Sequence, residues 1–552
     1  AVSSLSESMI IGIIISIIIV GLYFRSAILA FIPLAFFGIS YSITLGIVYL
    51  IFGVVEKTTL SFIVTTLSAI LILGLSVDYS VYMLNRFVRS KAEDRLENTV
   101  KWAGHAVFTS GLTVIISYIV LALFNIPLIG DGGYVNALGI TISLGVALTL
   151  LPSFLRLFHT SIRRPEHLVN FEKVAKVSRD HKNILVIALV LLFVFSLIVY
   201  EVTPTSFDLL SLIPNNAGKI GYYEIASKYG YDPLTPNFIL LNFTSPLYSA
   251  GKFNTSELSI LNSISSGLLS QNSIGAISTV TYPFGNMVNL TGLSGSNASI
   301  GQIINQSLTF IGKDGKTVLI QIYLKNVSFS QQAINAMSSV DSFIKGIIPE
   351  NIVYYIGGPS QSLLDSSNFI SNSTVKIVEI LAVIIFAVLA YQLSTIFTPL
   401  RLLFNVGTSA LVAVVMFYGV FYYMLHMPII VFGPLFVIVT LFGVGLDYDI
   451  FLVTRTREEV IKGKDDVEAI SEALKENAGV ILALGLILAG VFGSLIMSPI
   501  AIIKEIGFSI TMGVLIDTMV SWLFLIPALM LIMKKYNWWP SKIASGKLRN
   551  GK

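Results

Sequence analysis

Long runs of apolar residues dominate the sequence and limit the folds open to it. Hydrophobic residues make up 54% of the 552 and charged residues only 12%, and the mean hydropathy is +0.82. The apolar residues gather in blocks of about 18 or more, the length that an α-helix needs to cross a hydrocarbon core of about 30 Å. A soluble chain would carry about twice this charged fraction, so we expect a mainly α-helical, multi-pass membrane protein. Eleven spans are predicted, near residues 8–24, 27–52, 60–88, 104–126, 134–158, 184–201, 373–397, 400–424, 429–455, 478–497 and 503–533.

The distribution of basic residues predicts the orientation of these spans in the cell membrane. Lysine and arginine gather in alternate connections, at residues 86–101, 163–182 and 455–464 and in the tail beyond 534. The short connections on the other side hold only Lys57 and Lys504. Because short cytoplasmic loops carry an excess of lysine and arginine, we expect the N-terminus and the polar stretch 202–372 outside the cell. The C-terminus is then cytoplasmic.

The polar stretch 202–372 has the pattern of a folded α+β domain. Strand-like runs occur at 238–243, 274–281, 318–324 and 352–356, and helix-like patterns at 256–269 and 331–347. The order is βαβ, an insert and a second βαβ, which predicts a ferredoxin-like fold.

The same stretch is rich in N-x-S/T sequons, and none occurs in a predicted cytoplasmic loop. A domain rich in Asn, Ser and Thr makes some sequons by chance, but their restriction to the expected outer surface favours N-glycosylation. Together with the absence of cysteine and the abundance of isoleucine, the sequons suggest an archaeal cell envelope. The seven candidate acceptors are Asn242, Asn254, Asn289, Asn297, Asn305, Asn326 and Asn372.

Two five-helix blocks resemble each other in sequence. The third span of the first block contains G-L-S-V-D-Y at residues 74–79, and the third span of the second contains G-V-G-L-D-Y at 443–448. Both blocks begin outside and hold an odd number of helices, so we expect parallel repeats related by an axis along the membrane normal. The predicted parts are a first repeat (1–158), a cytoplasmic linker (159–183), a linking helix (184–201), the outside domain (202–372), a second repeat (373–533) and a cytoplasmic tail (534–552).

Aspartates in the middle of these spans are the strongest candidates for function. Placing one there is unfavourable by about 2.5–3.5 kcal/mol on insertion scales. Even so, Asp78, Asp447 and Asp449 stand in the matched third spans and Asp517 in the last span. We expect no lysine or arginine at comparable depth, so desolvation disfavours the charged form and leaves these carboxyl groups protonated part of the time. A carboxyl group that alternates between neutral and charged forms is what proton coupling requires.

Tyr79 and Tyr448 follow the matched aspartates, and each is expected to donate a hydrogen bond to the aspartate of the other repeat. The alternative is that these polar groups only hold two helices together. Asp449 is two residues from Asp447 and so points to another helix face, where a structural role is as plausible as proton relay. Ser110 in the fourth span is a further relay candidate, although membrane serines commonly bond to their own helix.

Several classes of chemistry have no support in the sequence. The chain has no cysteine, which excludes disulfides, thiolate metal sites and cysteine nucleophiles. Its five histidines are scattered without metal-ligand spacing, and there is no glycine loop of the kind that binds phosphates. We therefore expect no enzymatic activity, no metal or other cofactor and no nucleic-acid partner.

On these motifs the chain resembles the MmpL-type branch of the resistance-nodulation-division (RND) superfamily. The twin Asp-Tyr motifs, the repeated five-helix blocks and the outside α+β domain carry the resemblance over nearly the whole chain. It implies that Asp78, Tyr79, Asp447 and Tyr448 carry protons inward while an outside porter domain passes hydrophobic cargo. It also places the polar position of the family's fifth helix at Ser110.

The resemblance has one departure. The family pattern has twelve spans and two porter domains, whereas this chain opens at the second span. The first helix and first porter domain are then absent, either because they were removed or because a second polypeptide supplies them. We expect the second polypeptide.

The function expected on these grounds is a proton-driven exporter or flippase of lipids or other hydrophobic molecules. A SecDF-like factor that uses the proton-motive force for protein export is one alternative. A non-transporting scaffold or receptor of the cell envelope is another. An Asp447→Asn change separates the first two from the third, because a scaffold needs no titratable group.

Overall fold

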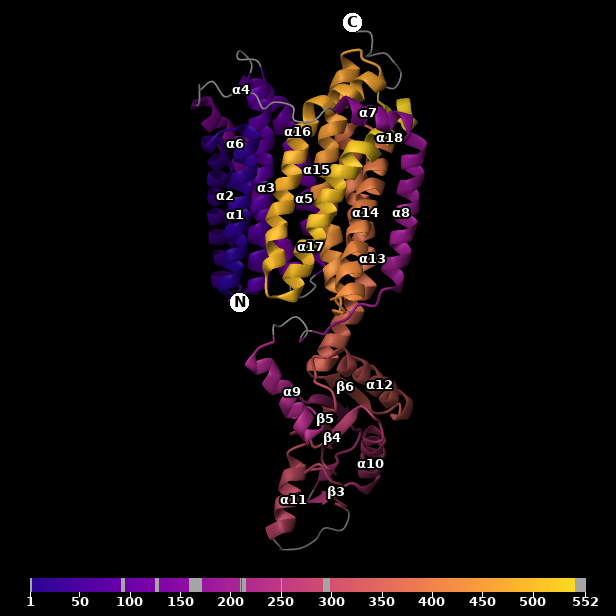
Figure 1. Ribbon diagram of the computed structural model, residues 1–552. Coiled ribbons are helices and arrows are strands. Elements are labelled where there is room, and N and C mark those ends of the chain that lie inside the picture. Colours follow the sequence, from indigo (N-terminus) through magenta and orange to yellow (C-terminus); the bar gives the residue numbers. More distant parts are fainter. Residues whose placement is uncertain are drawn as a thin grey trace. The chain divides into compact units, whose positions relative to one another are not determined.

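A computed structural model describes residues 2–90, 95–124, 129–157, 171–208, 210, 215–249, 251–290 and 298–541. Residues 159–170 of the predicted linker and the tail beyond 541 lie outside the described residues. The chain forms two compact units (Figure 1), one made of Ala1–Pro204 with Asn372–Lys552 and the other of Thr205–Ser371.

The first unit is a bundle of long apolar helices. Within the described residues, eleven helices are long and apolar enough to span a membrane, as predicted, and the protein is a mainly α-helical, multi-pass membrane protein. The first repeat consists of α1 (Val2–Phe24), α2 (Ala27–Val48) with the π-helical η1 (Tyr49–Val55), α3 (Phe62–Arg89), α4 (Arg95–Asn98), η3 (Thr99–Gly104), α5 (His105–Leu123) and α6 (Ile129–Leu157). The linking segment forms α7 (Phe171–Asp180) and α8 (Lys182–Val202). The second repeat consists of α13 (Pro359–Leu393), α14 (Phe397–Phe417), η4 (Tyr418–Met424), α15 (Phe432–Ile461), α16 (Asp466–Gly493), η5 (Ser494–Met497), α17 (Ala501–Ile516), η6 (Asp517–Leu525), α18 (Ile526–Met533) and η7 (Lys534–Trp538).

Polar side chains set where several of these helices begin. Ser26 accepts a hydrogen bond from the amide of Leu29 at the start of α2, and Asp465 accepts one from the amide of Glu468 at the start of α16. Such a side chain satisfies one of the amides that the first helical turn leaves unpaired. The acidic residues in the first turn of α16 also favour the positive end of the helix dipole. The helix therefore begins well before residue 478, where hydrophobicity alone predicts its start.

The two repeats pack through their third and fourth helices. α3 packs against α16, and α15 packs against α5. The matched glycines lie at these contacts: a methyl group on Gly74 would lie 2.5 Å from an atom of α16, and one on Gly443 would lie 3.2 Å from an atom of α5. Four residues after each matched aspartate, Tyr82 and Phe451 stack on each other with ring centroids 3.7 Å apart. Equivalent residues of the two repeats therefore contact each other.

The second unit has the predicted ferredoxin-like topology. Its antiparallel sheet has the strand order β4-β5-β1-β6, made of β1 (Asn237–Asn242), β4 (Ile274–Ser278), β5 (Thr317–Leu324) and β6 (Val353–Gly357). α10 (Thr255–Leu269) lies between β1 and β4 in sequence, and α12 (Gln331–Ile347) lies between β5 and β6. The unit also contains α9 (Ala217–Tyr229), α11 (Ala298–Leu308) and the short strands β2 (Tyr248–Ser249) and β3 (Lys252–Phe253).

Alternation along β5 explains how this unit forms its core. Every second side chain of the strand is fully buried, beginning at Val318, while the residues between are partly exposed. Side chains on a strand alternate between the two faces of the sheet, so one face of β5 is apolar. That face packs in one cluster with α10 and α12, which contribute Leu261 and Met337.

Candidate functional site

The two Asp-Tyr pairs lie inside the buried core of the first unit. α3 places Asp78 and Tyr79, α15 places Asp447 and Tyr448, and each of the four residues is at most 2% exposed. α15 is buried on all sides along Phe432–Val453. A helix that is apolar around its whole circumference suits such a central position, and its few polar residues then have no contact with solvent.

Each tyrosine lies beside the aspartate of the other repeat. The Tyr448 hydroxyl lies beside the Asp78 carboxyl group, and Tyr79 lies near Asp447 and Ser110. Within the described residues, the hydroxyl groups of Tyr79, Tyr448 and Ser110 have no hydrogen-bond partner of good geometry. The same holds for both carboxyl oxygens of Asp447 and for Oδ1 of Asp78. These five residues, here called the Asp-Tyr cluster, therefore keep unused capacity to donate and accept hydrogen bonds.

Asp449 belongs to a second polar cluster, within the second repeat, whose Asp517 is also an electrostatic neighbour of Asp447 and Tyr448. Asn405 on α14 donates from Nδ2 to Asp449 Oδ2 at 3.2 Å, and Ser409, one turn further, donates to Asp517 Oδ1 at 3.3 Å. Arg401, one turn before Asn405, is 5% exposed and is an electrostatic neighbour of Asp449. We call these five residues the Arg401 cluster. Asp449 thus points away from the Asp-Tyr cluster, as its spacing from Asp447 predicts.

Arg401 overturns the expectation that no basic residue lies at the depth of the aspartates. Its Nη1 donates to the backbone carbonyl of Ile526 at 3.4 Å, and its Nε and Nη2 have no partner among the described residues. The sequence placed it at the edge of a span, where arginine is common, but α14 begins earlier, at Phe397, and the arginine contacts Ile526 at the start of α18. One signal was available: Arg401, Asn405 and Ser409 repeat every four residues and so share one face of an apolar helix.

In the described part of the chain, a cavity lies between the repeats at each end of α3 and α15. The first is lined by the opening turns of α3, α6, α15 and α17, and it contains Ser68 and Asn136. The Ser68 hydroxyl and the Asn136 amide are buried, with no hydrogen-bond partner in the described part of the chain. The second cavity lies at the closing turns of α3 and α15, beyond the stacked rings of Tyr82 and Phe451. Along both helices, the Asp-Tyr cluster lies between these two cavities.

The chemistry that these groups offer is proton binding and hydrogen bonding. No cluster of three or more His, Cys, Asp or Glu side chains suited to a metal ion occurs among the described residues. The Asp-Tyr cluster instead combines two carboxyl groups with three hydroxyl groups. In a site without solvent, such a carboxyl group is stable in the neutral form and needs a specific partner when it is charged.

Most of the sequon asparagines lie on the protein surface. Asn242, Asn289, Asn305, Asn326 and Asn372 are exposed, whereas Asn254 is partly buried and caps α10 by accepting a hydrogen bond from the amide of Ser256. Asn297 lies outside the described residues.

Comparison with known proteins identifies the family. A model of the MMPL family matches residues 2–172 and 291–549. The mycolic acid-containing lipids exporter MmpL11 of Mycolicibacterium smegmatis is 22% identical over 548 residues, which cover 94% of this chain and 53% of that protein. The heme uptake protein MmpL11 of Mycobacterium tuberculosis is 23% identical over 544 residues, which cover 94% of this chain and 52% of that protein.

A third relative is the apo-petrobactin exporter of Bacillus anthracis, 24% identical over 565 residues, which cover 95% of this chain and 69% of that protein. The chain therefore spans between 52% and 69% of the length of these three relatives. Because the family model covers most of the chain, in both transmembrane repeats, the chain belongs to the MMPL family.

Proposed function

We propose that this chain is the proton-coupling part of a transporter that moves lipids or other hydrophobic molecules across or out of the membrane. One observation carries the proposal: two Asp-Tyr pairs, one from each repeat, meet in a single buried cluster with unused hydrogen-bonding capacity. A carboxyl group without solvent or a close cation changes its partners when it gains or loses a proton. Protonation of Asp78 or Asp447 therefore alters the attraction between α3 and α15.

The surroundings of the cluster support a path for protons. Ser68 and Asn136 provide buried polar groups in the cavity at one end of α3 and α15. Arginine side chains line the cavity at the other end. A proton that enters from the first cavity would reach Asp78 or Asp447, with Tyr79, Tyr448 and Ser110 as hydrogen-bonding partners of the charged form. Its release toward the second cavity would return the site to the starting state.

The relatives support the cargo class. One is named for export of lipids, one for uptake of heme and one for export of a siderophore. These names favour amphipathic small molecules or lipids over a protein-export role. With the basic loops in the cytoplasm, inward proton flow would drive cargo outward, and the second unit, with glycans on its exposed sequons, would face the outside.

The test is proton flux in proteoliposomes that carry a pH gradient and enclose a pH-sensitive dye. We expect the native chain to take up protons and the double variant Asp78→Asn/Asp447→Asn to fall to the rate of protein-free liposomes. Asn has nearly the size of Asp and still forms hydrogen bonds, but one acceptor oxygen becomes an NH2 donor and the side chain does not titrate.

Asp131→Asn is the matched control. Asp131 lies in the first turn of α6, is exposed and undergoes the same Asp-to-Asn substitution outside both clusters. Native flux in this control is expected. Equal flux in the native protein and the double variant, or no flux in the native protein, would contradict the proposal.

A further inference from the structure

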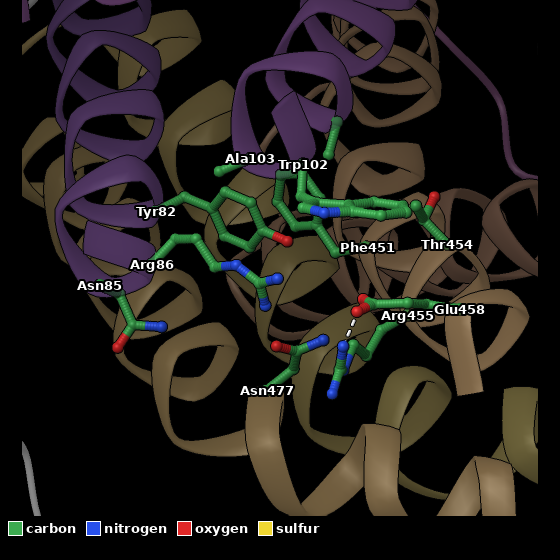
Figure 2. Close-up of a pocket in the computed structure, with 11 residues that line it drawn as sticks. Tyr82, Asn85, Arg86, Trp102, Ala103, Phe451, Thr454, Arg455, Glu458 and Asn477 are labelled. Carbon is green, nitrogen blue, oxygen red and sulfur yellow. Dashed lines mark ion pairs between the residues drawn. The ribbon is translucent and has the colours of Figure 1, made fainter. Parts of the chain in front are cut away.

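The cavity at the closing turns of α3 and α15 has a volume of about 640 Å³ in its wider part. Its walls come from α3, η3, α15 and α16, so both repeats contribute. Arg86 and Arg455 each follow the matched aspartate of their repeat by eight residues, and both extend into this space. Figure 2 shows these two arginines together with Trp102 and Asn477 around the same opening. This group is not part of either polar cluster described above.

Three nitrogen donors in this wall lack acceptors. Arg86 Nε, Arg455 Nε and Asn477 Nδ2 are each buried without a hydrogen-bond partner among the described residues. A buried donor left unpaired is unfavourable, and native proteins pair nearly all of them with protein, water or a ligand. Three such donors around one opening, from α3, α15 and α16, point to a ligand that presents several acceptor oxygens.

The charges around the cavity are unequal. Arg455 forms ion pairs with Glu458, Glu459 and Glu476. Lys462 pairs with the first two of these carboxylates, and Lys464 pairs with Glu459, so three cations face three carboxylates. The carboxylates that border the opening are therefore already neutralised. Within the described residues, Arg86 forms no ion pair with a carboxylate.

Arg89 adds a second unbalanced positive charge. It donates only to neutral oxygens in the described part of the chain, Asn85 Oδ1 and the backbone carbonyl of Glu476, both at 3.1 Å. Lys475 and Glu472 on α16 also line the wider part of the cavity and offset each other. The net charge of the opening is therefore positive.

We propose that this cavity binds a phosphate-type oxyanion, held by Arg86 with Arg455, Asn477 and Arg89. A guanidinium presents N–H donors in a planar fork that matches phosphate oxygens. Arg86 supplies an uncompensated charge, and the Nε of Arg455 and the amide of Asn477 supply directed donors. The phosphate belongs either to a membrane phospholipid, whose headgroup lies at the depth of helix ends, or to a soluble molecule. The proposal is independent of proton coupling, because it needs no titratable group.

Two measurements on the full-length protein in uncharged detergent separate these sources. The first is calorimetric titration with inorganic phosphate, against sodium chloride of equal ionic strength. The second is native mass spectrometry of protein taken from nanodiscs that contain phosphatidic acid, which counts retained phospholipid. Saturable phosphate binding with no retained lipid identifies a soluble ligand. Retained lipid that inorganic phosphate displaces identifies a headgroup. If the protein binds no phosphate and retains no phospholipid, the proposal is overturned.

Variants locate the site. Arg86→Gln removes the uncompensated charge, and Asn477→Leu removes a donor from another helix at similar volume. Each is expected to weaken binding about tenfold or more, since a hydrogen bond to a charged group contributes about 1.5–3 kcal/mol. Arg156→Gln, at the exposed end of α6 on the same side of the bundle, is the charge-matched control and should bind like the native protein. If the Arg86→Gln variant does not fold, binding by the Asn477→Leu variant tests the site. Native affinity in the folded variants would place the anion elsewhere and overturn the proposal.

Discussion

Arg401 lies in a buried part of the bundle, where a charge without a counter-charge destabilises the fold. It is buried, has two guanidinium nitrogens without partners in the described chain, and has Asp449 as its electrostatic counterpart. We predict that Asp449→Asn lowers stability by about 3 kcal/mol, because a buried guanidinium cannot shed its charge. Arg401→Met should be milder, because the remaining carboxyl group can neutralise itself by binding a proton.

Thermal unfolding in detergent ranks these variants by stability. The double variant Arg401→Met/Asp449→Asn should have an unfolding temperature close to that of Arg401→Met and well above that of Asp449→Asn. The two side chains interact, so the effects of the two substitutions are not additive. Strictly additive shifts, or an Asp449→Asn variant as stable as the native protein, would show that the two side chains do not form a charge pair.

The residues of the candidate site differ in how far the sequence reveals them. Asp78 and Asp447 could be found because each stands in a repeated motif within an apolar span, where a carboxyl group needs an explanation. The spacing of Arg401, Asn405 and Ser409 puts all three on one helix face. The burial of Arg401 could not be found in the sequence, because it depends on where α14 begins and on a contact with Ile526 of α18, far along the chain. The burial of a charged side chain depends on tertiary packing, so the hydrophobicity pattern along the chain does not predict it.

At the scale of helices, number and order follow from the sequence, but helix ends do not. The predicted span at 104–126 is the apolar part of a longer helical stretch that begins at Arg95, and α16 begins at Asp466 before its apolar segment. In both, charged turns extend the helix beyond the apolar core. In α16 the Asp465 cap and the acidic first turn stabilise a helix end that hydrophobicity does not register.

The contact between α5 and α6 gives an element-scale prediction with an internal control. A methyl group on Gly133 would lie 2.6 Å from the backbone nitrogen of Ala122 and 2.8 Å from the carbonyl oxygen of Tyr118, whereas one on Gly132 would have its nearest contact at 4.0 Å. Gly133→Ala must push the two helices apart and should lower stability by about 1–3 kcal/mol. Gly132→Ala should be neutral or stabilise by up to about 1 kcal/mol through helix propensity.

Thermal unfolding of the two variants side by side checks this packing. Both changes add the same methyl group in the same helical turn, so the contact with α5 is the main difference between them. If the Gly133→Ala and Gly132→Ala variants unfold at the same temperature, α5 does not approach α6 closely at this point.

At the scale of the whole molecule, the absence of cysteine makes the orientation directly measurable. A single introduced cysteine is then the only thiol, and a membrane-impermeant maleimide reports which side of the membrane it faces. Ser338→Cys places the thiol on the exposed face of α12 in the second unit, and Val467→Cys places it on the exposed first turn of α16.

The bias of lysine and arginine toward the connection between α15 and α16 predicts that this connection is cytoplasmic and the second unit is outside. Intact cells should therefore label at Ser338→Cys, and Val467→Cys should label only after permeabilisation, while the native chain stays unlabelled in both conditions. The reverse pattern would place the sequons in the cytoplasm and end the glycosylation proposal. It would also turn the proton path around, so that the cavity containing Ser68 and Asn136 opened toward the cytoplasm.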